Sequence, residues 1–376
     1  MFENLFNQNV RPIGLDIGQT MVKMIQLSRQ GEIWRVDAAE EADLDPQLEP
    51  DSDAWRQAVV DALLRCVQHG GFHGRQVVSC LPGDVLKIKS LRLDTADPEQ
   101  IEQLIFTEVA PKFGLDAALD EIRYSVAGSV YQGEEIKNEV IFFGIDRSQL
   151  AAHIDLLEQA ALEPIAIETV PGALFRSFQA TLRRREDKEV VSVFVDLGAK
   201  YTTVIIGRGQ EIAFIKQIPL AGRQFNEQVA ARLDIPLEDA MKLRSRLLGA
   251  DAEGIDSETA RAVRDAMSAS VEELAHEISL CFKYYAVTFR GRRPSEAVFA
   301  GGEAYESSLM DALRRHLGVE IRIAEPLRGF DLTRAGFDRR RNPQLCEWTI
   351  AVGLALKGVE QMTIPQEQTQ TTGGAE

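Results

Sequence analysis

Short apolar runs open the chain and predict three strands followed by a helix. The runs read PIGLDIG (12–18), TMVKMIQLS (20–28) and EIWRVDAAEE (32–41). The first run stops at Asp16 and turns through Gly18 before the second begins. DAWRQAVVDALLRCVQHGG (53–71) then spaces its apolar residues as a helix does and ends on glycines, which favours a helix terminus.

The opening pattern returns near the middle of the chain. In VVSVFVDLGAKYTTVIIGRGQEIAFIKQ (190–217) an apolar run again ends on an acid, Asp196, and Gly198 follows before two further runs. A repeat of this length indicates two related domains rather than a solenoid. The alternative is a coincidence between two β-hairpins, because D-x-G turns are common.

A glycine pair forms the third recurring feature. EAVFAGGEAYESSLMDALRRHLG (296–318) reads as a buried strand, then Gly301 and Gly302, then Glu303 at the start of an amphipathic helix. Glycines between a strand and a helix let a flat or anionic ligand approach the backbone closely. Together with the two D-x-G hairpins, this segment predicts a nucleotide site.

Composition narrows the class of protein. The chain has 376 residues, which predicts two domains. Its 42 basic and 58 acidic residues give a net charge of −16, which argues against general nucleic-acid binding. The 4 cysteines lie among apolar residues without a C-x-x-C pair, as free thiols in a reducing compartment do. No apolar run is long enough to span a bilayer and no signal peptide opens the sequence, so we expect a cytoplasmic protein.

Two D-x-G hairpins that face each other across a cleft suit the polyphosphate of a nucleotide such as ATP. Backbone N–H groups of the turns can donate to phosphate oxygens. The aspartates Asp16 and Asp196 can hold Mg²⁺, directly or through water, because this ion prefers oxygen ligands. Lys23 either reaches a phosphate as a point charge or faces solvent from its strand. The residues expected around the nucleotide are Asp16, Gly18, Thr20, Lys23, Asp196, Gly198, Thr202, Thr203, Gly301, Gly302 and Glu303.

These motifs resemble those of the actin-like ATPase superfamily. DIGQTMVK is similar to its first phosphate motif, DLGAKYTT to its second and FAGGEA to its adenosine motif. IETVPGALFRSF (167–178) resembles the first connecting segment, where the resemblance implies a water-orienting role for Glu168. EWTIAVGLALKG, near the end, resembles the second connecting helix.

Within the superfamily the chain resembles the PilM family of type IV pilus assembly. The likeness is carried by CLPGDVLKIKSLRL (80–93), DPEQIEQLIFTEVAPKFGLDAALDEIRYSV (97–126) and VIFFGIDRSQLAAHIDLLEQAALEPIAIET (140–169). LAGRQFNEQVAARLDIPLEDAMKLR (220–244) resembles that family's helical 2B region. The resemblance implies that Lys242 contacts the adenosine; the alternative is a solvated helix lysine.

The resemblance implies an α/β fold of duplicated actin-like (ribonuclease H-like) domains around a nucleotide cleft, with an inserted subdomain in the first domain. The insert itself reads as a β-α-β-β-α-β unit that buries its helices on one sheet face. The expected parts are domain 1A (10–85, 166–189 and 343–360), the inserted 1C subdomain (86–165), domain 2A (190–222 and 294–342), the helical 2B subdomain (223–293) and a disordered tail (361–376).

The implied function is a cytoplasmic, ATP- and Mg²⁺-binding scaffold at the inner membrane. Its implied partner is the short N-terminal cytoplasmic peptide of a PilN-like inner-membrane protein, alongside other pilus assembly components. ATP turnover is expected to be slow at most, and self-association is left open. The peptide groove is expected on the first domain beside the insert. Candidate surfaces are the strand 140–145 and the helix face of Ile101, Leu104, Ile105 and Val109, unless that face packs on the insert's own sheet.

Two other functions of the same superfamily compete with the scaffold. A small-molecule kinase needs a substrate pocket with a catalytic acid, and no sugar-kinase signature is found in the sequence. An FtsA-like polymerising scaffold carries a C-terminal amphipathic membrane helix, whereas this sequence ends in the polar TIPQEQTQTTGGAE. The scaffold of pilus assembly is therefore the leading hypothesis.

Overall fold

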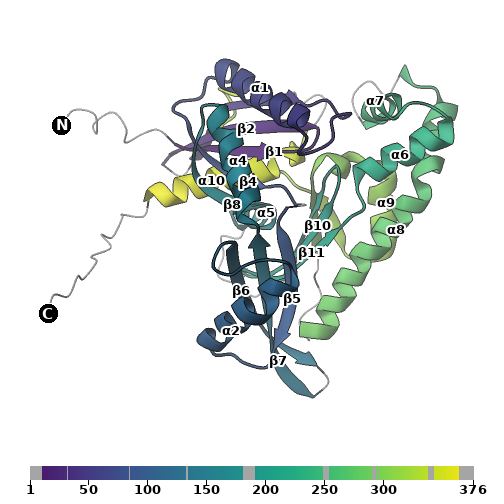
Figure 1. Ribbon diagram of the computed structural model, residues 1–376. Coiled ribbons are helices and arrows are strands. Elements are labelled where there is room, and N and C mark those ends of the chain that lie inside the picture. The colour runs from purple at the N-terminus through teal and green to yellow at the C-terminus, as the bar shows by residue number, and fades with distance from the viewer. Residues whose placement is uncertain are drawn as a thin grey trace, which may run out of the picture.

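Two five-stranded sheets with the same topology form the centre of the protein (Figure 1). The computed structural model describes residues 11–31, 33–83, 85–132, 134–180, 191–248, 254–289, 294, 296–337 and 343–363. Of the expected tail at 361–376, residues 361–363 form the end of the last helix. The rest of the tail, from residue 364 onward, lies outside the described residues. The charged runs at 183–185 and 339–342 also lie outside them.

The first sheet begins with an antiparallel meander and ends with two parallel strands. Its central strand, β1, is buried over most of its length. No room exists for a side chain at Gly14, because a Cβ there would lie 2.2 Å from the carbonyl oxygen of Ala351 in the last helix. In spatial order the strands are β3 (Ile33–Asp43), β2 (Met21–Gln30), β1 (Ile13–Ile17), β4 (Gln76–Leu81) and β8 (Glu163–Thr169).

The second sheet repeats this order strand for strand. Its antiparallel meander and parallel pair correspond to those of the first sheet, with β9 in the place of β1. The internal repeat predicted from the sequence is thus confirmed as a duplicated fold. In spatial order the strands are β11 (Glu211–Ile218), β10 (Thr202–Arg208), β9 (Val191–Leu197), β12 (Glu296–Ala300) and β13 (Glu320–Ile323).

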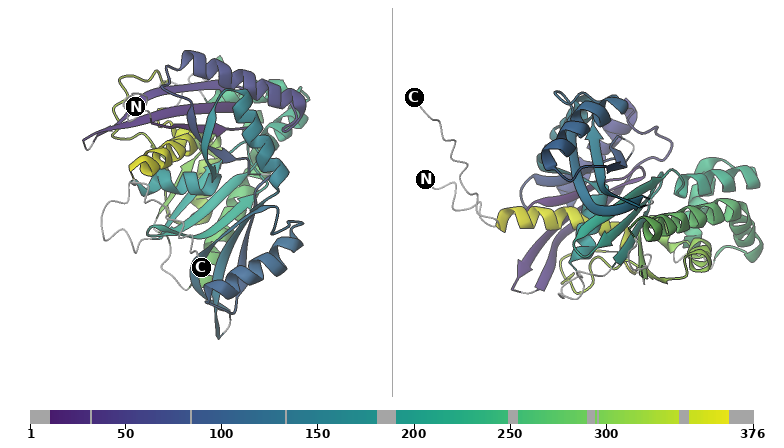
Figure 2. Two further views of the ribbon diagram at one scale, coloured as in Figure 1. Left: turned by 60° about the vertical axis from the view of Figure 1, so that its left-hand side comes forward. Right: turned by 90° about the horizontal axis from the view of Figure 1, so that it is seen from below.

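Helices cover the sheets and cross between them (Figure 2). The first half buries α1 and α4 against β1 and β2 in one apolar cluster, and α5 packs against α10 between the halves. Four helices of the second half share one large core with its sheet. The helices are α1 (Asp53–His69), α4 (Arg147–Gln159), α5 (Val170–Gln179), α6 (Gly222–Leu233), α7 (Leu237–Leu248), α8 (Ser257–Phe289), α9 (Ser307–Leu317) and α10 (Thr349–Thr363).

A three-stranded insert sheet, in the order β5-β7-β6, separates β4 from α4 along the chain. The helical stretch between β5 and β6 packs on this sheet: Ile101 and Ile105 share a buried cluster with Val140 and Phe142. The helix face therefore forms part of the insert's own core, as the alternative interpretation expected. The elements are β5 (Lys87–Leu93), α2 (Pro98–Leu104), a π-helical turn (Ile105–Val109), α3 (Ala110–Lys112), β6 (Glu121–Gln132) and β7 (Glu135–Ile145).

The expected β-α-β-β-α-β unit is wrong in its last two elements. β8 pairs with β4 of the first sheet, not with the insert sheet. Leu156 and Leu157 of α4 pack with Trp55 and Leu63 of α1. The proposed insert range of 86–165 therefore includes α4 and β8, which the pairing and packing join to the first sheet.

Backbone contact defines the crossing of α5 and α10. A Cβ built on Gly353 of α10 would lie only 1.8 Å from the carbonyl oxygen of Ala173 in α5. Only glycine permits this approach, although glycine weakens a helix interior. The close approach holds together the two helices that follow the last strand of each sheet.

We expect Gly353→Ala to destabilise the protein by about 3 kcal/mol, because α5 and α10 must separate to admit the methyl group. Helix propensity alone predicts the opposite sign, a gain of about 1 kcal/mol. Urea unfolding followed by circular dichroism measures the change. Gly336→Ala is the matched control, since a Cβ there has no atom within 4 Å. An unfolding free energy of Gly353→Ala equal to or above the wild-type value contradicts the crossing described above.

Candidate functional site

The two D-x-G turns are built alike. The N–H of Gly18 donates to the carbonyl oxygen of Met21 at 2.9 Å, and the N–H of Gly198 donates to that of Tyr201 at 3.2 Å. A Cβ at either glycine would lie 2.9 or 3.0 Å from the same carbonyl oxygen. The glycine N–H groups thus close the turns themselves, so backbone donors for a phosphate must come from the residues that follow each glycine.

The aspartates of the two turns lie close enough to influence each other. Asp16 is on β1 and is partly buried, while Asp196 is on β9 and is 8% exposed. Burial and the nearby Asp16 carboxylate together raise the pKa of Asp196 to about 7, against the opposing effect of the Lys23 ammonium. Burial likewise raises the pKa of Asp16 against the same lysine. The structure therefore brings together the three charged residues that the sequence proposed for phosphate and metal.

A third acid, Glu168 at the end of β8, is held by two cations. Its carboxylate accepts hydrogen bonds from Lys357 Nζ at 2.6 Å and from Arg176 Nη2 at 3.1 Å. Burial would raise the pKa of Glu168, but the Lys357 ammonium, the Thr169 N–H and Arg176 outweigh it and lower the pKa. The carboxylate is thus an ion-pair partner of α5 and α10, and its water-orienting role stays a prediction.

A buried thiol places Glu168 near the two aspartates. Cys80 Sγ lies 4.0 Å from Asp16 Oδ1. Burial raises the pKa of Cys80, and the charges of Asp16, Glu168 and Asp196 raise it further. The carboxylates of Asp16, Glu168 and Asp196 therefore all lie near enough to influence the thiol of Cys80 on β4. All 4 cysteines are free and buried, as the sequence predicted.

Gly301 packs directly on the second aspartate. Its φ is +87°, and a Cβ there would lie 2.4 Å from the carbonyl oxygen of Leu197 and 2.7 Å from Asp196 Oδ1. Gly302 is different, because a Cβ there would have no atom within 4 Å. The backbone at Gly302 is therefore approachable, as the sequence predicted for a ligand. A 3₁₀ turn (Gly302–Tyr305) follows, so the α-helix begins at Ser307 and not directly after the glycines.

Glu303 is bound by an arginine that the sequence analysis missed. Arg244 of α7 is 3% exposed, and its Nη2 donates to Glu303 Oε2 at 2.5 Å. Its Nη1 donates to Asn226 Oδ1 at 2.7 Å, and its guanidinium lies over the ring of Phe225. The signal was present in the sequence, since Ala240 and Arg244 lie four residues apart on the buried face of α7.

Lys242 lies on another face of the same helix. Its side chain is 65% exposed and pairs with Glu238 one helical turn earlier. The expected contact of Lys242 with an adenosine stays a prediction, and the cation that the structure brings to Glu303 is Arg244. This arrangement agrees with the alternative interpretation of Lys242 as a solvated helix lysine.

The predicted hydroxyl donors divide into two kinds. Thr202 is buried, and its hydroxyl donates to the carbonyl oxygen of Leu220 at 2.8 Å, so it holds β10 to the segment before α6. Thr203 is the cross-strand partner of Asp196. Thr20 accepts a hydrogen bond from the Leu44 N–H at its carbonyl. Thr20 and Thr203 thus remain candidates for phosphate contact, whereas the hydroxyl of Thr202 is already used.

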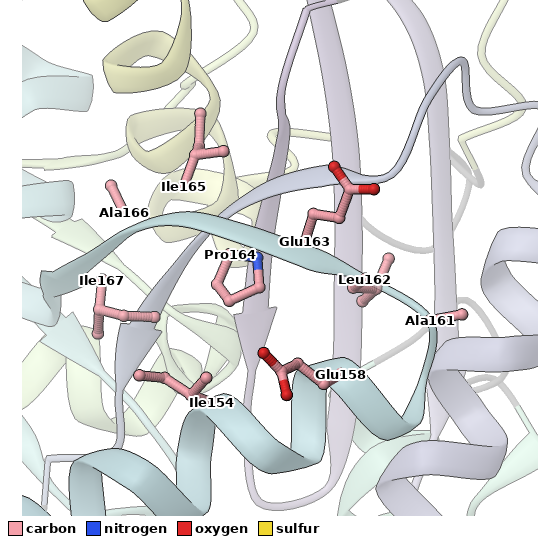
Figure 3. Close-up of a pocket in the computed structure, with 9 residues that line it drawn as sticks. All are labelled: Ile154, Glu158, Ala161, Leu162, Glu163, Pro164, Ile165, Ala166 and Ile167. Carbon is pink, nitrogen blue, oxygen red and sulfur yellow. The ribbon is translucent and has the colours of Figure 1, made fainter.

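A shallow groove of about 800 Å³ runs between α4 and β8, away from the aspartates (Figure 3). β8 is the edge strand of the first sheet. The N–H of Glu163 points to β4, where it donates to Arg75, so the neighbouring Pro164 presents no N–H to the free edge. A bulge at Ile165 and the carboxylate of Glu158 add to this protection. This edge is therefore poorly suited to accept another strand.

A narrower cavity of about 120 Å³ lies between α1, α4 and the start of the insert. Ile17, between Asp16 and Gly18, lines one wall, and Pro82 and Val85 line another. Trp55 is 5% exposed, and its indole Nε1–H has no hydrogen-bond partner among the described residues. The apolar side chains of Ile17, Val85 and Leu156 in this lining suit an apolar group of a ligand.

In the part of the chain that the structure describes, side chains alone do not complete a metal centre. Among the described residues, no group of three or more His, Cys, Asp and Glu side chains is arranged to hold a metal ion. A cation at Asp16 and Asp196 would need water or phosphate oxygens as further ligands, which Mg²⁺ accepts. The donor set therefore fits Mg²⁺ delivered with a nucleotide and does not fit a resident metal.

The buried aspartates predict an unusual pH dependence of stability. The pKa of Asp196 rises from 3.8 to about 7 on folding, so the folded state binds the proton more tightly and stability falls as pH rises through that range. We expect Asp196→Asn, without nucleotide or metal, to be more stable than wild type near neutral pH, by up to about 4 kcal/mol. Near pH 4 the difference should vanish. Denaturant unfolding at both pH values tests this, and a pH-independent difference between the proteins contradicts it.

Comparison with known proteins agrees with this architecture. The family model for type IV pilus assembly protein PilM matches residues 14–359. A solved PilM–PilN type IV pilus biogenesis complex is similar with a TM-score of 0.74 and 20% identity, covering 93% of this chain and 99% of that chain. The ethanolamine utilization protein EutJ from Carboxydothermus hydrogenoformans is similar with a TM-score of 0.54 and 15% identity, covering 94% of both chains.

MreB5 of Spiroplasma citri bound to ADP is less similar, with a TM-score of 0.48 and 12% identity, covering 94% of this chain and 98% of that chain. The family model spans both D-x-G turns, the insert, the glycine pair and the crossing helices. The chain therefore belongs to the PilM family of type IV pilus assembly proteins and has the actin-like ATPase fold.

Proposed function

We propose that this protein binds ATP with Mg²⁺ between its two halves and acts as a scaffold of pilus assembly. Asp16 and Asp196 hold the Mg²⁺, directly or through water, and Lys23 contacts a phosphate. The adenosine lies against Gly302, where the backbone is open, beside the Arg244–Glu303 pair. Bound Mg²⁺ neutralises phosphate charge and orients the polyphosphate.

One observation carries the nucleotide proposal: two carboxylates from repeated turns are held together at the cost of raised pKa values. Two like charges in a desolvated site oppose each other, and Lys23 offsets them only in part. A divalent cation would remove this repulsion. Hard oxygen ligands on two facing turns are the chemistry that Mg²⁺ with a polyphosphate requires.

We expect Asp16→Asn and Asp196→Asn each to weaken binding of ATP with Mg²⁺ by about tenfold or more, since each removes an anionic ligand (about 1.4 kcal/mol per tenfold). Isothermal calorimetry measures the affinity. Asp61→Asn, on the exposed face of α1, is the matched control and should bind as wild type does. Unchanged affinity in both site variants would refute the assignment of the metal site.

The partner in this proposal is the N-terminal cytoplasmic peptide of a PilN-like inner-membrane protein. The similar PilM–PilN complex supports the identity of the partner. We place the peptide in the cavity of Trp55, which lies on the first half beside the entry to the insert. Its lining of Ile17, Val85 and Leu156 suits apolar side chains of the peptide.

The proposed location is the cytoplasmic face of the inner membrane, reached through this partner. Among the described residues, no helix has the length and apolarity that a membrane span needs. A tethered peptide loses conformational entropy when it binds, so a preformed apolar cavity favours its docking.

ATP turnover is not needed for this role. The carboxylate of Glu168 is already bound by Lys357 and Arg176, which supports nucleotide binding with slow hydrolysis at most. Membership of the PilM family favours the pilus scaffold over a small-molecule kinase. Self-association and contacts with other pilus assembly components belong to the same proposal, and the net charge of −16 agrees with protein rather than nucleic-acid partners.

We expect Trp55→Phe to weaken binding of the PilN-like N-terminal peptide by about tenfold, because the smaller phenylalanine ring removes part of the lining that the peptide contacts. Fluorescence anisotropy with the labelled peptide measures the affinity. Trp34→Phe is the control, because Trp34 stacks on Phe330 and does not line this cavity. Equal peptide affinity of both variants and wild type would place the peptide elsewhere.

A further inference from the structure

The insert is joined by sequence to the first half but packs on the second. Ala127 of β6 and Ile141 of β7 share a buried apolar cluster with Ile215 of β11. Val130 of β6 is fully buried within the core of the second half. The side chain of Gln217 in β11 also donates to the carbonyl oxygen of Gly83, just before the insert. Figure 1 shows the insert strands beside β11 and the lower end of α8.

A polar network around one buried carboxylate crosses the same interface. Glu139 of β7 has 0% exposure and pairs with Arg92 of β5 at 3.2 Å within the insert. Tyr284 of α8 donates its hydroxyl to Glu139 Oε1 at 3.1 Å. Arg92 Nη2 donates to the Tyr284 hydroxyl at 2.9 Å and to Thr288 Oγ1 at 3.1 Å. Three hydrogen bonds therefore join the insert to α8 around one buried carboxylate.

Separating the insert from the second half is energetically unfavourable. Separation of the insert from the second half would expose the apolar cluster around Ile141 to water and would break the three hydrogen bonds to α8. Both losses disfavour opening. The insert should therefore move with the second half when the two halves rotate.

The cavity of Trp55 lies beside the insert, so such a movement would shift part of its lining. Pro82 and Val85, which lead into the insert, form one of its walls, and Gln149, soon after the insert ends, lies on α4. Trp55 and Ile17 belong to the first half. The cavity thus has walls on both sides of the point at which the insert joins the first half.

We propose that the contact of Arg92 and Glu139 with Tyr284 and Thr288 transmits the nucleotide state of the cleft to the Trp55 cavity. This inference rests on the proposed function, since it assumes nucleotide in the cleft and a peptide in the cavity. Nucleotide bound by both halves changes their relative rotation, the insert follows the second half, and Pro82 and Val85 shift against Trp55. Because coupling of two binding sites is reciprocal, the peptide changes nucleotide affinity by the same factor.

The test uses the double variant Tyr284→Phe/Thr288→Val. It removes the three hydrogen bonds across the interface and leaves the Arg92–Glu139 pair within the insert. Tyr124→Phe is the matched control, because it removes a phenol from the other face of the insert, where Tyr124 donates to Pro98. Amide hydrogen exchange of the full chain is measured with and without ATP and Mg²⁺, which serve as the probe.

In wild type and in Tyr124→Phe, we expect ATP with Mg²⁺ to slow exchange in α7 and to change it about fivefold or more in the first turns of α4. In the double variant the change in α7 should remain and that in α4 should fall to less than about half. A wild-type response in α7 without one in α4, or an undiminished α4 response in the double variant, overturns this inference and leaves the proposed function standing. Absence of any response to ATP and Mg²⁺ overturns both.

Discussion

The enforced proximity of two buried carboxylates is the constraint on which the site depends. Asp16 and Asp196 come from equivalent turns of duplicated sheets, and each sheet is stabilised by its own core. Burial and mutual repulsion raise the pKa of Asp196 to about 7. The folds of both halves hold this unfavourable pair in place, and a cation with polyphosphate would relieve it. The buried carboxylates thus lower the folding stability at the place where the protein is proposed to bind its ligand.

Two connections join the halves on either side of this pair. On one side, α5 and α10 meet at Gly353 with backbone contact, and the Glu168–Lys357 ion pair joins β8 to α10 beside them. On the other side, the insert packs on β11 and α8. A rotation of the halves about the helix crossing has to carry the insert with it. The proposed nucleotide site between the halves would therefore be linked to the outer surface of the first half.

The sequence predicted what is local and repeated. The D-x-G turns, the glycine pair and the duplicated strand order follow from short patterns of apolar residues, acids and glycines. The prediction failed where segments far apart in the sequence pair. The strand β8 was assigned to the end of the insert, but it pairs with β4, and no local pattern indicates a partner so distant along the chain. Lys242 was predicted from the resemblance of its helix to the 2B region of the family, and Arg244 was missed because its carboxylate partner, Glu303, lies 59 residues away along the chain. The unpaired N–H of Trp55 has no sequence signal, since burial without a partner is a property of the folded state.

Proton release on nucleotide binding tests the central claim most directly. With a pKa of about 7, Asp196 is close to half protonated at neutral pH in the free protein, and Mg²⁺ at its carboxylate must displace that proton. Calorimetry of ATP with Mg²⁺ in two buffers that differ in ionisation enthalpy measures the protons released. The account predicts release of about half a proton per site near pH 7, lost in Asp196→Asn. Binding without proton release, or equal binding of ATP when Mg²⁺ is chelated, would contradict it.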